Sequence, residues 1–219
     1  MKNIADKMKN LNILYIVFIS LILSSCECHF IYSDPDLCEW QTVEYTVTDD
    51  LIFTYEINTN GNFLEAHRID SDDVFDAFGE SVSDEAEIKK IELVGASFAY
   101  SSYSDNEAEK ISFQAFVAEN DLELLLMNET GEFDIPDGLG ESFAANALLN
   151  TVGVTKMKEL VRDYAGLLNF GSFDVLALGT TLPQGKLCHV QLDIAMRFTM
   201  VYEDCRWLPL GMGDETCEG

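Results

Sequence analysis

Basic side chains are scarce in this chain of 219 residues. It contains 13 lysines and arginines against 39 aspartates and glutamates, which leaves a formal net charge of −26. A negative field of this size repels phosphate backbones and disfavours flat contact with anionic lipid head groups. We therefore expect no nucleic-acid partner. The composition favours a solvated acidic surface, with cation binding by carboxylates as the alternative.

Catalytic motifs are also absent from the sequence. It contains no Gly-x-Ser-x-Gly elbow, no His-Glu-x-x-His and no phosphate-binding loop of the Walker type. Residues 138–140, Gly-Leu-Gly, precede a predicted helix but lack the third glycine of a dinucleotide-binding turn. The histidines are only His29, His67 and His189, and His189 falls on the polar side of a predicted strand, where a solvated side chain is expected. We predict a protein that is not an enzyme, with no cofactor and no metal ion.

Long hydrophobic runs are lacking as well. The N-terminal apolar run, from Leu11 to Leu23, is about thirteen residues long and follows Lys2, Lys7 and Lys9. A helix that spans a bilayer needs about twenty apolar residues, whereas the apolar part of a secretion signal has about seven to fifteen. The length favours a processed signal over a membrane span.

The apolar run ends in Leu23-Ser24-Ser25-Cys26. This tetrapeptide resembles the lipobox of bacterial lipoproteins. The resemblance implies that residues 1–25 are removed, that the Cys26 thiol takes a diacylglycerol and that the new amino group takes a further acyl chain. Two or more chains give durable anchoring, so the implied location is the bacterial cell envelope, most often the outer membrane. The alternatives are an ordinary secretion signal that leaves Cys26 as a thiol and an uncleaved anchor.

Five cysteines remain if Cys26 is acylated. Cys188 lies on the apolar side of a regular strand pattern and is predicted to be a buried free thiol. An oxidising envelope then makes two disulfides plausible among the other four, which are Cys28, Cys38, Cys205 and Cys217. Pairing 28 with 38 and 205 with 217 closes short loops, whereas crossed pairing ties the two ends of the domain together.

Alternation of apolar and polar residues predicts strands over 42–57, 88–100, 110–117 and 122–127, and a final hairpin that ends in the strand 188–202. The pair Asp49-Asp50 interrupts the first pattern. A bent or bulged continuous strand and a hairpin with an odd-length loop both keep its apolar face whole.

The two later hairpins are predicted with four-residue loops. The loop 118–121 sets Val117 opposite Leu122, and the loop 182–185 sets Ala177 opposite Val190. Both registers preserve one apolar face. At about 3.3 Å a residue, the last strand spans roughly 50 Å and must therefore curve.

Helices are predicted at three places. A short one begins at Asp70 or Ser71 and ends before Gly79, so the carboxylates of residues 70–73 cap it rather than bind calcium. A change of period to 3.6 predicts a pair of helices over 141–153 and from Thr155 to just before Gly171. The fold class is therefore mainly β (α+β): an antiparallel sandwich or a strongly curved sheet of about six to eight strands with a helical pair packed on it.

The expected domains are a signal peptide (1–25), a tether with cysteines (26–41) and one β-rich domain (42–219). Two functions fit. The first is a non-catalytic envelope lipoprotein, held at the membrane through Cys26, that binds a protein or glycan partner or serves a structural role. The second is a carrier of an apolar ligand held between sheet and helices, lined by Leu160, Tyr164, Met196, Phe198 and Met200. We expect these side chains to be fully covered by the opposing layer, which favours the first.

Overall fold

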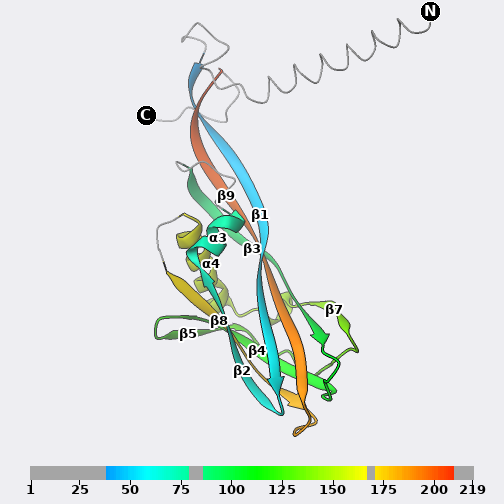
Figure 1. Cartoon of the computed structure of the whole chain (residues 1–219). Helices are drawn as coiled ribbons and strands as arrows, with labels where there is room; N and C mark the ends of the chain where they lie inside the picture. Colours follow the sequence, from blue (N-terminus) through cyan, green and yellow to red (C-terminus); the bar gives the residue numbers. More distant parts are fainter. Residues whose placement is uncertain (1–37, 79–85, 167–170, 210–219) are drawn as a thin grey trace, which may run out of the picture. The chain divides into compact units, whose positions relative to one another are not determined.

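The computed structural model describes residues 38–78, 86–166 and 171–209 (Figure 1). The signal segment 1–25, the lipobox with Cys26, and Cys28 and Cys217 lie outside these residues. By its contacts the chain divides into two compact units, Tyr45–Tyr202 and Met1–Glu44 with Glu203–Gly219. The boundaries expected from the sequence stay a prediction.

The described residues include nine strands and two α-helices. The strands are β1 (Cys38–Thr59), β2 (Asn62–Asp70), β3 (Glu87–Ser102), β4 (Lys110–Glu119), β5 (Leu122–Met127), β6 (Phe133–Asp134), β7 (Leu139–Ala144), β8 (Ser172–Leu182) and β9 (Cys188–Pro209). The helices are α3 (Ser71–Phe78) and α4 (Thr151–Ala165), preceded by a 3-10 turn, η2 (Asn146–Leu148). The predicted class, mainly β with a helical pair, is confirmed.

The strands form two sheets. The order in the four-stranded sheet is β1-β9-β3-β7, and in the five-stranded sheet it is β2-β8-β4-β5, with β6 paired to β4 (Figure 1). Their apolar faces form one core cluster together with α3 and α4. In β9, Val190, Leu192, Ile194 and Phe198 are all 0% exposed. Each such side chain contributes about 1.5–3 kcal/mol when it leaves water, so the alternating pattern accounts for much of the stability.

β1 is continuous through Asp49-Asp50, which decides between the two alternatives left open by the sequence. Asp50 lies on the outer face, where its two carboxylate oxygens accept hydrogen bonds from Nε and Nη2 of Arg197 on β9 at 2.9 and 2.7 Å. The interruption of the pattern is therefore a cross-strand ion pair and not a turn. The chain turns later, at residues 60–61.

The predicted hairpin of β8 and β9 is wrong. β8 lies between β2 and β4, with Ala177 opposite Glu65 and Ala115, while β9 lies in the other sheet. The two strands present their apolar faces to the same core from opposite sides. That arrangement requires the same alternation as a hairpin, so the pattern could not separate the two.

The predicted helix over 141–153 is also wrong, because most of it is β7 followed by η2. Gly153 does not stop a helix but lies inside the first turn of α4, whose N-cap is Asn150. A Cβ atom at Gly153 would lie 2.2 Å from the Leu125 carbonyl oxygen. The glycine therefore permits close packing of α4 on β5. The helical pair consists of α3 and α4, which contact each other.

Over residues 116–119 the register of β4 and β5 differs by two residues from the predicted one, and an irregularity then sets Ala115 opposite Met127. Val117 pairs with Leu124 and Glu119 with Leu122, so the turn contains only Asn120 and Asp121. Asn120 has a φ of 53°, a left-handed conformation that asparagine tolerates. A shift of two residues keeps the side chains of residues 116–119 on their faces, which is why the apolar pattern did not exclude it.

In the smaller unit, the described residues are the first residues of β1 and the last residues of β9. The rings of Trp40 and Trp207 lie 6.2 Å apart between centroids. Arg206 Nε donates a hydrogen bond to the buried Asp204 carboxylate at 2.8 Å.

Candidate functional site

The five side chains predicted to line an apolar pocket are all in the core. Leu160 and Tyr164 of α4 are 1% exposed, and Met196, Phe198 and Met200 of β9 are 0% exposed. The Phe78 ring of α3 contacts Phe198 edge to face, at 6.2 Å between centroids. Full coverage is confirmed for these five side chains, which pack against other residues of the core cluster.

Cys188 is a free thiol whose side chain is fully buried. Burial disfavours the thiolate and raises the pKa of Cys188 to about 11. Cys205 on β9 is disulfide-bonded, and Cys38 is the first residue of β1. The two-disulfide pairing itself stays a prediction.

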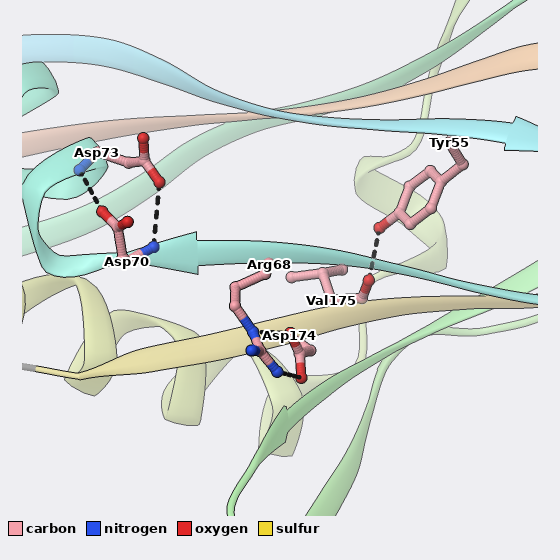
Figure 2. A network of polar contacts seen from close by, with 6 residues as sticks. All are labelled: Tyr55, Arg68, Asp70, Asp73, Asp174 and Val175. Carbon is pink, nitrogen blue, oxygen red and sulfur yellow. Dashed lines mark hydrogen bonds and ion pairs between the residues drawn. The ribbon is translucent and has the colours of Figure 1, made fainter.

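Figure 2 shows how polar groups tie the elements together near β2 and β8. The buried Tyr55 hydroxyl of β1 donates to the Val175 carbonyl oxygen of β8 at 3.0 Å, and so joins the two sheets. Desolvation raises the pKa of Tyr55 far above its usual value. On the outer face, Arg68 binds Asp174 with Nε and Nη2 at 2.9 and 3.1 Å. These groups stabilise the fold, and each already has a hydrogen-bonding partner within the protein.

The acidic cluster before α3 is a helix cap. The Asp70 carboxylate accepts from the Asp73 N–H at 3.1 Å, and the Asp73 carboxylate accepts from the Asp70 N–H at 3.0 Å (Figure 2). This reciprocal pair is a capping box. The Asp70 carboxylate also accepts from the Asp72 N–H at 3.0 Å. The interpretation of residues 70–73 as capping groups rather than calcium ligands is supported by this geometry.

His189 is not the solvated side chain expected from its place in the sequence. Its Nδ1 lies 2.7 Å from an Asp105 carboxylate oxygen and its Nε2 lies 3.4 Å from one of Glu56, and its side chain is 16% exposed. The Tyr103 ring stacks on the imidazole at 4.0 Å between centroids. The backbone is tied as well, because Tyr103 N–H donates to the His189 carbonyl at 3.0 Å.

Both nitrogens of His189 therefore face carboxylates. Desolvation lowers the pKa of His189, while the hydrogen bonds to Asp105 and Glu56 raise it by more, so that the net pKa lies above its usual value. With each ring nitrogen facing a carboxylate, His189 forms a clamp with Asp105 and Glu56. The sequence carried no signal for this cluster, whose carboxylates are 84 and 133 residues away.

One hollow lies on the outer face of the five-stranded sheet, over β2, β8 and β4. Its volume is about 280 Å³. Two neighbouring cross-strand rows run through this region. In one, Thr180 is opposite Asn62 and Ser112, and in the other, Leu178 is opposite Leu64 and Gln114. Glu129, in the segment after β5, also lines it. No sequence pattern pointed to this hollow, because the rows exist only once the strand order is known.

Most polar groups of the hollow can still form hydrogen bonds with a ligand. Ser112 Oγ and Thr180 Oγ1 lie within hydrogen-bonding distance of each other, at 3.1 Å, and each hydroxyl keeps further capacity. Within residues 38–78, 86–166 and 171–209, the side chains of Asn62, Gln114 and Glu129 have no hydrogen-bonding partner. Leu178 is 37% exposed beside them and Leu64 is 62% exposed. In this hollow, donors and acceptors without a partner among the described residues lie beside exposed apolar surface.

In the described part of the chain, no group of three or more histidine, cysteine, aspartate or glutamate side chains is arranged to hold a metal ion. No helix there is long and apolar enough to cross a membrane.

Comparisons with known proteins identify no family. No protein-family description and no curated protein matches the sequence. Among solved structures, the capsid protein of BFDV, from a decameric crystal structure, matches with a TM-score of 0.30 at 9% identity over 76% of this chain and 99% of that one. The structure of the Gx strain of infectious bursal disease virus matches with a TM-score of 0.23 at 8% identity, over 76% of this chain and 39% of that one. Similarities this weak carry no argument about function.

Proposed function

We propose that this protein is a non-catalytic lipoprotein of the bacterial envelope, anchored through Cys26, whose folded part binds a partner on its surface. The observation that carries the proposal is the difference between the two faces of the five-stranded sheet. The side chains of the inner face pack in the core. The outer face has a hollow whose polar side chains have few hydrogen-bonding partners among the described residues, and exposed leucines lie beside it. The anchor rests on the pattern of residues 23–26.

The alternative, a carrier of an apolar ligand, needs space between the layers. Leu160, Tyr164 and Phe198 would have to separate from their neighbours before a lipid could enter, and each is at most 1% exposed. Opening such a core forfeits the close packing that stabilises it. The buried positions therefore favour a binding module over a carrier.

The anchor is tested by expression of the full chain in a bacterium fed radiolabelled palmitate. We expect label in the wild-type protein and none in Cys26→Ser. The matched control is Cys28→Ser, which removes a neighbouring thiol and should keep the label. Label that persists in Cys26→Ser, or a serine variant that still partitions with membranes, contradicts the lipobox interpretation.

A further inference from the structure

We propose that the hollow on the five-stranded sheet binds one ring of a neutral glycan. This inference rests on the proposed function and names the class of partner for that site. It depends on three properties of the hollow: the kind of polar group it presents, the apolar side chain beside them, and its charge.

The polar groups match hydroxyls. A sugar hydroxyl both donates and accepts, and so do the amide and hydroxyl side chains of Asn62, Gln114 and Ser112. Thr180 lies between Asn62 and Ser112 in one cross-strand row, so that these three side chains follow one line across β2, β8 and β4, and Gln114 lies in the next row. Side chains in one row of neighbouring strands are about 5 Å apart, a spacing that lets one ring contact several of them.

The apolar part matches the C–H face of a sugar ring. Leu178 belongs to the next row and is 37% exposed, with Gln114 opposite it on one side and Leu64 on the other. The hollow, at about 280 Å³, is near the lower limit of roughly 300 Å³ for small-molecule pockets. It therefore suits a single ring, with the remainder of a longer glycan outside it.

Charge selects a neutral ligand. Among the described residues, Glu129 is the only ionisable side chain that lines the hollow. The nearest cation of the same face in β2, Arg68, is already bound by both oxygens of Asp174. Lys110 of β4, on the same face, is paired with Glu132 at 3.2 Å. Among the described residues that line the hollow there is therefore no cation for an anionic sugar, which the net charge of −26 also repels. A single exposed carboxylate is in turn a weak attraction for a cation.

The test is an NMR titration of the full-length Cys26→Ser protein with five neutral monosaccharides: glucose, galactose, mannose, fucose and N-acetylglucosamine. Glucuronate serves as the anionic control. We expect at least one neutral sugar to shift the side-chain amide signals of Asn62 and Gln114 in a saturable way, and glucuronate to shift neither. Gln114→Ala should weaken the binding about fivefold, the contribution of one hydrogen bond, and Leu178→Ser should also weaken it.

The matched control is Val152→Ser, which removes an apolar side chain that is 60% exposed on α4 and should leave the binding unchanged. The inference is overturned if no neutral sugar moves these signals. It is overturned equally if Gln114→Ala and Leu178→Ser bind as the wild type does, or if an envelope protein occupies the hollow without a glycan. In each of these cases a native mass spectrum free of lipid keeps the proposed function, whereas a bound lipid contradicts the proposed function itself.

Discussion

At the scale of single residues, His189 shows how contacts change the chemistry of a side chain. The imidazole lies between Asp105 and Glu56 and under the ring of Tyr103. Its pKa in the folded protein is above the usual value of 6.5. Protonation therefore favours the folded state. This contribution is fully present below about pH 6.5 and is lost as the pH rises through the pKa of the folded protein.

We predict that Asp105→Asn lowers the pKa of His189, because it removes the carboxylate at the shorter distance. The measurement is an NMR titration of the imidazole ring. Glu107→Gln is the control: Glu107 lies in the same loop but pairs with Lys186 at 3.3 Å, so the pKa of His189 should stay unchanged. If the pKa in Asp105→Asn equals that of the wild type, the clamp is not formed in solution.

Cys188 leads to a second prediction at this scale. Its thiol is fully buried, and its pKa is raised to about 11, so that almost no thiolate exists at pH 8. In the oxidised Cys26→Ser protein, a thiol reagent should find one reactive cysteine after unfolding and none before. Three or more reactive thiols in the native protein would rule out the scheme with two disulfides.

At the scale of elements, the sequence predicts the strands better than their partners. Alternation over 110–117 and 122–127 predicted β4 and β5, and the carboxylates of Asp70 and Asp73 predicted the start of α3. Alternation depends on which face is buried and not on which strand is adjacent. It could therefore not separate a hairpin of β8 and β9 from two strands facing each other across the core. β2 was missed because His67 and Glu65 interrupt its apolar face.

The close approach of α4 and β5 predicts the effect of Gly153→Ala. Helix propensity alone would make alanine stabilising by about 1 kcal/mol. The added Cβ would instead lie 2.2 Å from the Leu125 carbonyl oxygen, and we expect a net loss of about 1–3 kcal/mol, as in other overpacked sites. Urea unfolding measures the change.

The control is Gly61→Ala, since a Cβ at Gly61 meets nothing within 4 Å and its φ is not positive. Its free energy of unfolding should change by less than about 1 kcal/mol. A stabilised Gly153→Ala protein would show that the helix does not pack this closely on β5.

At the scale of the molecule, composition and alternation were sufficient to predict the fold class. The acidity of the chain was sufficient to expect no nucleic-acid partner. The candidate site could not be predicted. Asn62, Ser112 and Leu178 come from three strands, and they share a surface only because β8 lies between β2 and β4. Long-range strand order is the information that a local pattern does not contain.

The central claim is that the interior is closed and that binding takes place on the outer surface. Native mass spectrometry of the Cys26→Ser protein, purified from the bacterium that expresses it, tests this most directly. Because Leu160, Met196 and Phe198 are covered by their neighbours, we predict the mass of the polypeptide with no apolar adduct. A stoichiometric adduct with the mass of a fatty acid or phospholipid, lost in Leu160→Asp or Phe198→Asp, would contradict the account and identify the protein as a lipid carrier.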